Sequence, residues 1–498
     1  MGNQPGAEAS ATLDNGGLAV DLALGEARHD PALRGDVSAF LRNQNSLIDI
    51  QKHHLHKTFA LGLWEKRLGV LLRIATAFTG LAIAAGLAFM IWNAANSDEL
   101  IVDAFSVPPD LAARGLTGQA VAAELVDQLA DMQARTTSNR ASQSFANSFG
   151  DGIKLEIPET GISLSELDRF LREKLGHDTH ISGEVIRTAA GLVLKARAGA
   201  LGHAKIQGPE NDSDMLVQQL AGEIFKLTQP YRYGIYLGIQ GHQAEAIAHF
   251  KALAKTGPSE ERAWDNVGIG TYTIEQEGND PALVYYNRAQ ILDPQNILAQ
   301  NNLGTTSERQ GRSEQAMQAM QKGLSLISGQ GAQKVRADYI PFLRQAMQAA
   351  IAASHGAFHD AAQIVVLARA EPGARGSNGV SESLARYQAG EHDLAAARAT
   401  MANPLGEDLG RIGLQNFTSI WANMFIDSKA EDWRGVLANS PALESLSQKY
   451  PGIASNFPAI TAPLIAYAQA RMGHFADAER RIPQRPAIAI PACVCVGK

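Results

Sequence analysis

Residues 74–92 read IATAFTGLAIAAGLAFMIW, nineteen consecutive residues without a charged side chain. An α-helix rises about 1.5 Å per residue, so a helix of this length covers about the 30 Å hydrocarbon core of a bilayer. Charged residues make up 19% of the chain, and such a long uncharged run is unusual at that composition. The run therefore predicts a transmembrane helix, with the buried core helix of a soluble domain as the alternative.

The charges beside this run predict its orientation. Acidic residues follow it at Asp98 and Glu99, whereas five basic residues precede it: Lys52, Lys57, Lys66, Arg67 and Arg73. Positively charged flanks stay in the cytoplasm. We therefore expect residues 1–73 inside and residues 93–498 in the periplasm of a bacterium, with the helix in the inner membrane.

The segment before the run divides into two parts. Residues 1–35 are rich in Gly, Ala, Asp and Glu without sustained periodicity, which predicts a disordered cytoplasmic tail. Residues 36–73 space apolar side chains three and four apart, which predicts a juxtamembrane helix. That helix could self-associate with a second copy through its apolar stripe, or it could lie along the membrane surface.

Residues 100–229 alternate strand-like and helix-like hydrophobic patterns, which predicts a small α/β domain in the periplasm. The expected order is β-α-β-α-β-β-α, with a hairpin over 180–200 that turns near Ala190–Gly191. The other expected strands are 100–107 and 153–159, and the expected helices are 119–134, 163–176 (capped by Ser163) and 212–229. In arrangement the domain resembles small periplasmic domains found beside β-propellers and in envelope assembly proteins.

A period near 34 residues begins at residue 227. The first unit supplies Gly234, Ala246, Phe250 and Pro258; the second supplies Trp264, Val267, Gly268, Ala282, Tyr286, Ala289 and Pro294; the third supplies Leu303, Gly304, Gly311, Ala316 and Met320. Later units are weaker and keep only a glycine with an alanine five residues on, at Gly356, Gly390 and Gly473. A further divergent helical pair is expected around Trp421–Trp433. These residues resemble the tetratricopeptide-repeat (TPR) family, which implies an α-solenoid of helical hairpins over residues 230–482.

The TPR resemblance also implies a binding site. In that family the first helix of each repeat lines a concave groove that binds peptides or partner proteins. The matching positions here are Asp265, Asn266, Ile269, Tyr272, Asn301, Asn302, Thr305, Glu308 and Arg309. The alternative is that these side chains only solvate an exposed helix face.

The end of the chain does not follow the repeat pattern. Pro483, Pro486 and Pro491 interrupt the last expected helix, which should end near Ile482 because proline inside a helix costs about 3 kcal/mol. No polar capping helix follows. We expect residues 483–498 to be an irregular tail, and we interpret the array as a truncated or frameshifted copy of a longer one.

Four longer stretches point to a more specific resemblance: QNSLIDIQKHHLHK (44–57), LWEKRLGVLLR (63–73), FSVPPDLAARGLTG (105–118) and HISGEVIRTAAG (180–191). They look like a group of membrane-anchored TPR proteins from alphaproteobacteria, whose relatives are sometimes labelled adenylate-cyclase-like. That label implies a cytosolic cyclase domain of well over a hundred residues. Only about seventy residues precede the expected span, so the label does not bring the activity with it.

No motif in the chain predicts catalysis or a cofactor. The net charge of −7 and the lack of a basic stripe argue against a nucleic-acid partner. The nucleotide, zinc-protease and nucleophile-elbow motifs GxxxxGK[ST], GxGxxG, HExxH and GxSxG are absent. Three groups of residues come nearest to a site: His53, His54 and His56; Cys493 and Cys495; and Glu156, Glu159, Glu166 and Asp168. We interpret them as an electropositive membrane flank, free thiols, and capping or solvating carboxylates, and we expect no metal, no cofactor and no enzyme.

The sequence as a whole predicts a mainly α protein with one transmembrane helix, a small α/β domain and an α-solenoid. Its expected function is a non-enzymatic scaffold that is anchored in the membrane and binds a protein or peptide partner in the periplasm. Two alternatives remain: a transmembrane signalling component that couples an external ligand to a cytosolic partner, and a degenerate cyclase-related protein.

Overall fold

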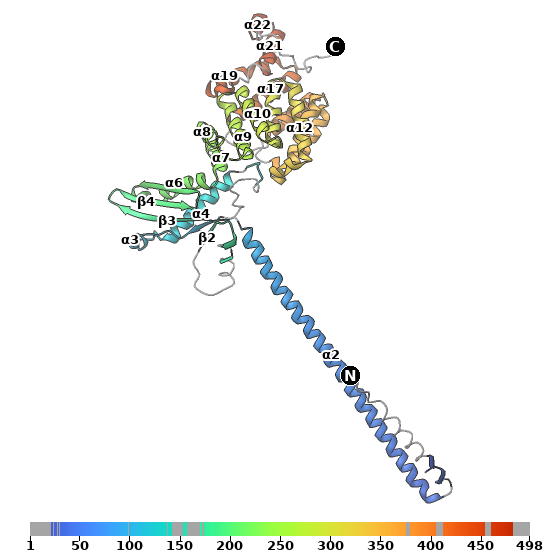
Figure 1. Cartoon of the computed structure of the whole chain (residues 1–498). Helices are drawn as coiled ribbons and strands as arrows, with labels where there is room; N and C mark the ends of the chain where they lie inside the picture. Colours follow the sequence, from blue (N-terminus) through green and yellow to red (C-terminus); the bar gives the residue numbers. More distant parts are fainter. Residues whose placement is uncertain are drawn as a thin grey trace. The chain divides into compact units, whose positions relative to one another are not determined.

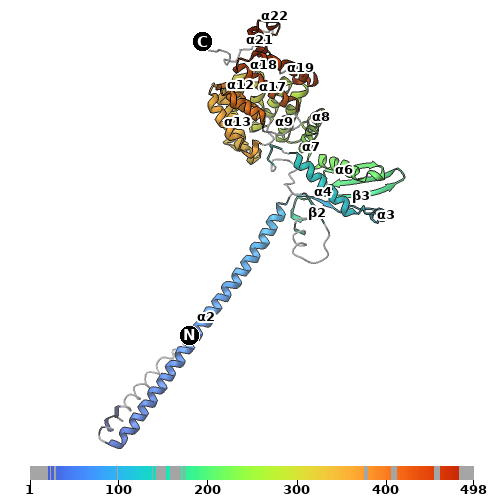
Figure 2. The same cartoon turned by 180° about the vertical axis from the view of Figure 1, so that it is seen from behind.

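The computed structural model describes residues 21–22, 24–26, 28, 30–97, 99–136, 138–141, 153–156, 170–171, 174–374, 379–404, 412–453 and 460–481. The chain forms two compact units, Met1–Asn93 and Ala94–Lys498. Figure 1 and Figure 2 show the chain from opposite sides. The fold is mainly helical and includes one mixed sheet of five strands.

A single helix, α2, runs without interruption from Pro31 to Ala95. Proline is tolerated at the first position because its missing N–H has no partner inside the helix. The expected juxtamembrane helix and the expected span are thus one element. Helix α2 begins inside the expected tail 1–35, and residues 21–22 and 24–26 of that tail are also helical. Residues 1–20 lie outside the described residues.

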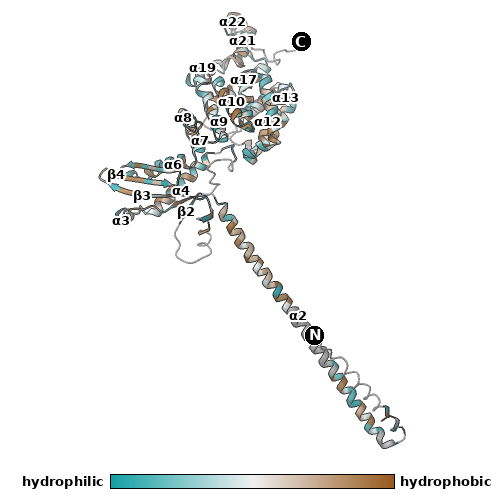
Figure 3. Cartoon of the chain, viewed as in Figure 1, coloured by the Kyte–Doolittle hydropathy of each residue, from teal (hydrophilic) through white to brown (hydrophobic). Residues whose placement is uncertain are grey.

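The second half of α2 is long and apolar enough to cross a membrane. This part, Gly69–Ala95, contains the expected span and has no residue in its most apolar window buried by the rest of the protein. Figure 3 colours it as largely hydrophobic. By length and composition, this part of α2 is therefore a candidate membrane span.

The α/β region is a five-stranded sheet in the order β2-β1-β3-β4-β5. Strand β1 pairs in parallel with β2 and β3, and β3, β4 and β5 form an antiparallel meander. The strands are β1 (Leu100–Asp103), β2 (Ile153–Glu156), β3 (Thr179–Thr188), β4 (Gly191–Ala198) and β5 (Gly202–Gly208). The predicted hairpin is present, but β5 is an additional strand that the prediction missed, because His203, Lys205 and Gln207 make it predominantly polar.

Two long helices cover the sheet. Helix α4 (Gly118–Arg135) contacts β1 and β2, α6 (Ser213–Thr228) contacts β4 and β5, and the two helices contact each other. Their apolar side chains, including Leu125 and Leu220, form one buried cluster with the strands. Short helices α3 (Pro109–Ala112) and η2 (Glu210–Asp212) complete the region, and most of the expected helix 163–176, with its Ser163 cap, lies outside the described residues.

Helices make up most of the remaining described residues. From α7 to α19 each α-helix contacts the next one in sequence, whereas α21 contacts α18 and α22. The helices are α7 (Pro230–Ile239), α8 (Gln243–Leu253), α9 (Ser259–Gln276), α10 (Asn279–Leu292), α11 (Ile297–Arg309), α12 (Ser313–Ile327), η3 (Gln330–Lys334), η4 (Ala337–Tyr339), α13 (Ile340–Ser354), α14 (Phe358–Ala368), η5 (Pro372–Ala374), α15 (Val380–Gly390), α16 (Leu394–Ala402), α17 (Ile412–Lys429), α18 (Trp433–Ala438), α19 (Ser440–Lys449), α21 (Ala462–Arg471) and α22 (Phe475–Arg481).

Glycine allows the hairpins to pack closely. A Cβ on Gly234 of α7 would lie 2.5 Å from the Phe250 ring, and one on Gly268 of α9 would lie 2.9 Å from the same ring. Phe250 of α8 is fully buried between these two helices. Small residues facing one large side chain thus set the spacing of three successive helices.

The last helices pack back against an early hairpin. Ile274 of α9 and Tyr286 of α10 share a buried cluster with Leu414 and Phe417 of α17, Leu443 of α19 and Ile465 of α21. The backbone N–H of Leu414 donates to the buried Glu275 carboxylate at 2.6 Å. Figures 1 and 2 both show α17 close to α9. The helical region therefore closes on itself, and residues 482–498 lie outside the described part.

Candidate functional site: a groove inside the helical region

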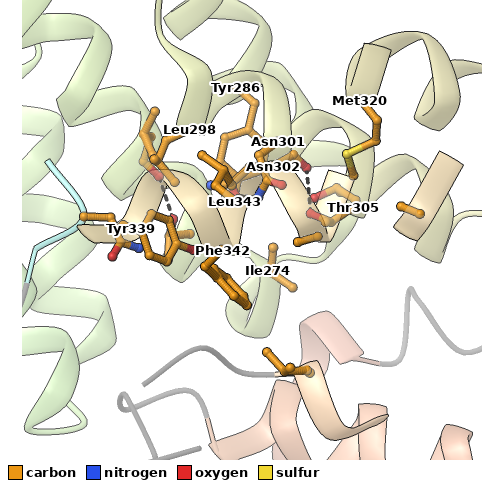
Figure 4. Close-up of a pocket in the computed structure, with 18 of the residues that line it drawn as sticks. Ile274, Tyr286, Leu298, Asn301, Asn302, Thr305, Met320, Tyr339, Phe342 and Leu343 are labelled. Carbon is orange, nitrogen blue, oxygen red and sulfur yellow. Dashed lines mark hydrogen bonds between the residues drawn. The ribbon is translucent and has the colours of Figure 1, made fainter. Parts of the chain in front are cut away.

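The inner surface of the helical region encloses a groove of about 300 Å³. Its walls come from helices that are far apart in sequence, mainly α7, α9, α11, α13 and α15, together with residues Ser138–Arg140 from the segment after α4. The closed arrangement of the hairpins brings these surfaces together. Figure 4 shows part of the groove.

Six of the nine residues proposed from the sequence line this groove: Tyr272, Asn301, Asn302, Thr305, Glu308 and Arg309. The other three, Asp265, Asn266 and Ile269, lie outside its lining, and none exposes more than 3% of its surface. They are covered because α9 is packed on several sides, by α7, α8, α10 and α17. Asn266, for example, donates its side-chain amide to the carbonyl of Arg262 at 2.6 Å within its own helix.

Polar side chains on α11 form one wall of the groove. Asn301 Nδ2 donates to Asn302 Oδ1 at 3.3 Å, and Thr305 Oγ1 donates to the Asn302 carbonyl at 3.3 Å (Figure 4). Next to them, the buried Thr306 hydroxyl has no hydrogen-bond partner among the described residues. Amide and hydroxyl groups of this kind can bind the N–H and C=O groups of a peptide backbone.

Apolar side chains form much of the remaining lining. They are Phe342 and Leu343 of α13, Tyr339 beside Phe342, Leu298 at the start of α11, and Met320 of α12 beyond Thr305 (Figure 4). All five are less than 9% exposed. A groove with one hydrogen-bonding wall and one apolar wall can hold an extended chain by its backbone and receive its side chains on the other side.

Part of the groove's lining comes from a segment outside the helical region. Arg140 forms an antiparallel bridge with Val335, next to η3. Ala141 N donates to the Lys334 carbonyl at 3.0 Å, and Arg336 N donates to the Asn139 carbonyl at 3.0 Å. Residues Ser138–Ala141 thus pair with the helical region through an isolated β-bridge and its two neighbouring backbone hydrogen bonds.

The Arg140 side chain anchors this strand. Its guanidinium is fully buried, forms a two-pronged ion pair with Glu261, and lies 5.4 Å from the ring centre of Tyr231 and 5.3 Å from that of Trp264. Ion pairing and aromatic contact together satisfy a planar cation that has left water. The buried Trp264 Nε1 has no hydrogen-bond partner within the described residues.

Ionisation near Arg140 is shifted by burial. The pKa of Asp265 is raised to about 8, chiefly by burial and also by the negative charge of Glu261, while the positive charge of Arg140 lowers it. Burial also raises the pKa of Tyr231. A pKa of about 8 keeps Asp265 mainly protonated at pH 7. The side chain that pairs with Arg140 is Glu261.

The sequence did not predict the role of Ser138–Ala141. This stretch is polar and lacks periodicity, so nothing in it indicated that Arg140 is buried. The groove residues on α13 and α15, such as Phe342 and Tyr387, were also missed, because the repeat pattern was too weak there to align positions.

The structure assembles no metal centre from the residues it describes. Within that part of the chain, no group of three or more His, Cys, Asp or Glu side chains is close enough to hold a metal ion. His53, His54 and His56 lie in α2, but their side chains, like that of Glu156 in β2, are outside the description. Glu159, Glu166, Asp168, Cys493 and Cys495 are outside it entirely, so interpretations of these residues stay predictions.

Comparison with known proteins adds no assignment. No protein-family model matches the chain, and no curated protein matches it significantly.

Proposed function

We propose that this protein is a non-enzymatic, membrane-anchored scaffold whose helical region binds a partner protein through the inner groove. The single observation that supports the proposal most is the groove itself. It has an amide and hydroxyl wall on α11 and an apolar wall on α13.

The proposed hairpins are of the TPR type. This assignment is supported by the close contacts of Gly234 and Gly268 with Phe250, and by the contact of Gly304 with Met320, where a Cβ would lie 2.6 Å from the methionine methyl group. These are the small and large positions on which the sequence resemblance depends. The helical region differs from an open solenoid, above all because α17 packs back against α9.

The partner that best suits the groove is a short extended segment of a protein. A volume of about 300 Å³ is at the lower end for ligand sites. An α-helix has a diameter of about 10 Å, which is too wide for such a space. An extended chain presents its backbone groups to Asn301, Asn302 and Thr305 and places alternate side chains against Phe342 and the other apolar residues.

The proposed location is the bacterial inner membrane, with the groove in the periplasm and the N-terminus in the cytoplasm. The apolar half of α2, Gly69–Ala95, supports the membrane anchor. The basic residues before it, such as Arg73, and the acidic Glu99 after it support the orientation. The bilayer is thus one partner, and self-association through the first half of α2 is a further one.

A photocrosslinking experiment tests the groove. A photoreactive amino acid is placed at Thr305 in the full chain, in its native membrane, and at Gln318 on the exposed face of α12 as the matched control. We expect a discrete protein adduct from position 305 and none from 318, and loss of that adduct when Asn301→Ala and Asn302→Ala are added. Equal adducts from both positions, or an adduct that survives the double substitution, would contradict the proposal.

A signalling role is the second candidate, and one observation favours it. Helix α2 is continuous from Pro31 to Ala95, so no break separates its first half from the apolar half. A rigid helix can transmit rotation or displacement across a membrane. A cytosolic partner that binds residues 36–66 and dissociates when an external ligand is added would distinguish this role from a static scaffold.

A further inference from the structure

Residues 138–141, hereafter the strap, pair with the wall of the groove in the manner of a bound peptide. The strap forms an isolated β-bridge at Arg140 and pairs with residues 334–336 through two backbone hydrogen bonds of 3.0 Å. A third contact joins Arg336 Nη1 to the Ser138 carbonyl at 3.4 Å. These bonds use backbone atoms of the strap and therefore do not depend on its side chains. Only one position of the strap makes a specific side-chain contact.

That position is Arg140. Its guanidinium is the strap's one charged group, and it lies between two aromatic rings with the Glu261 carboxylate across from it. The remaining strap side chains are small or uncharged: Ser138 Oγ accepts from the Arg140 backbone N–H at 3.1 Å. The strap thus combines one specific side-chain contact with general backbone pairing, which is how strand addition recognises an extended peptide.

We propose that the strap is an internal ligand of the groove, and that an external extended segment carrying arginine displaces it and binds in its place. This inference rests on the proposed function, because it names the chemistry of the partner that the groove binds. The receptor for the arginine is formed by Glu261, Tyr231 and Trp264, and the backbone pairs with residues 334–336.

The surroundings of Arg140 favour replacement of the strap by an external peptide over a permanent structural contact. The groove continues beyond the strap to the polar wall on α11, so a longer peptide can pair where the strap does and also bind Asn301 and Asn302. Trp264 Nε1 and Thr306 Oγ1 are buried in the lining, and the strap leaves both without a hydrogen bond. A partner that extends further can supply acceptors to these groups, which the four-residue strap does not.

The covalent link sets the strength of the competition. A ligand on the same chain has an effective concentration on the order of millimolar, so a free peptide with only the same contacts binds weakly while the strap is in place. The observed affinity is reduced by the fraction of molecules in which the groove is open. Weakening the strap should therefore raise the affinity for an external peptide.

The test uses a fluorescent synthetic peptide with the sequence TTSNRASQ, which is that of residues 136–143. Fluorescence anisotropy measures its binding to the full chain in detergent micelles. Arg140→Ala removes the strap's anchor, and Arg135→Ala is the matched control, because Arg135 is 59% exposed and pairs with Asp131 within α4. We expect Arg140→Ala to bind the peptide at least about tenfold more tightly than the wild type and Arg135→Ala.

A peptide with alanine in place of its arginine should lose this gain. If folded Arg140→Ala, checked by circular dichroism, binds no better than Arg135→Ala, or binds both peptides equally, the inference is wrong. Ala141→Pro is a second variant that keeps Arg140 but removes the N–H that donates to Lys334. It should also bind the arginine peptide more tightly, which keeps the test decisive if Arg140→Ala does not fold.

Hydrogen exchange of the wild-type chain gives an independent readout. The Ala141 and Arg336 amides should lose protection when the arginine peptide is added in excess, and keep it with the alanine peptide. Hydrogen exchange that is unchanged by either peptide would show that the strap is permanently bound in its site and is not displaced. If the crosslink at Thr305 depends on Asn301 and Asn302 while the peptide results are negative, the scaffold proposal stands and the strap inference alone fails.

Discussion

The buried carboxyl of Asp265 makes the stability of the helical region depend on pH. Asp265 is 3% exposed, and burial beside Glu261 raises its pKa to about 8 from 3.8. Between these two values the folded state holds a proton that the unfolded state has lost. Stability from this group is therefore fully present below pH 4 and falls as the pH rises through 8.

The size of the effect follows from the two pKa values. From pH 6 to pH 9 the unfolded state stays ionised while the folded state loses its proton, which lowers the free energy of unfolding by about 3 kcal/mol. For a folded unit of this size we expect a decrease in Tm of about 5 °C from this group. Asp265→Asn keeps the shape of the neutral side chain and cannot ionise, so the variant should lose this dependence.

The assay is thermal unfolding of the full chain in detergent micelles at pH 6 and pH 9, followed by tryptophan fluorescence. The relevant quantity is the change in Tm of the wild type minus that of Asp265→Asn, because other titrating groups cancel in the difference. Asp280→Asn is the control, since the Asp280 side chain is 75% exposed. If Asp265→Asn and the wild type lose the same Tm between the two pH values, a neutral Asp265 in the fold is refuted.

Two further substitutions test the packing. Gly238→Ala places a Cβ about 2.1 Å from the ring of Tyr272 and should lower the free energy of unfolding by about 2–3 kcal/mol. The control Gly222→Ala has open space around it in α6 and should leave the free energy of unfolding unchanged or raise it by about 1 kcal/mol. Equal denaturation midpoints for the two variants would contradict the close approach of Gly238 to Tyr272. Glu275→Ala leaves the Leu414 N–H without its acceptor and should lower the free energy of unfolding by about 3 kcal/mol. Hydrogen exchange at the start of α17 should become faster in this variant, and the control Glu275→Gln should retain most of the protection. Unchanged exchange in Glu275→Ala would show that this bond does not hold α17.

Elements with a strong local pattern were predicted well from the sequence. Helix α4 was expected over 119–134 and spans Gly118–Arg135, and α6 was expected to start at Asp212 or Ser213 and starts at Ser213. In both, apolar residues recur at helical spacing because one face packs on a sheet. The apolar run within Gly69–Ala95 was also predicted from a local pattern, because it is recognised by composition and length alone.

Features that depend on distant contacts were not predicted. The return of α17 to α9 is set by Glu275 and Leu414, which are 139 positions apart, and local periodicity carries no information about such a pair. Arg140 was missed because its partners belong to another region of the chain. For the groove, the repeat pattern predicted Asn301, Asn302 and Thr305 on an inner helix face, but it placed Asp265 on that face because it could not show how closely α9 is surrounded.

The contact between Glu275 and Leu414 also sets a time scale for synthesis of the protein. Helix α9 leaves the ribosome 139 residues before the first turn of α17, and at 5–20 residues per second this interval is about 7–28 s. During that time Ile274 and Tyr286, which α17, α19 and α21 later cover, lack their final neighbours. The nascent chain therefore exposes an apolar surface for seconds, at a stage when a chaperone or a second nascent chain can bind it first.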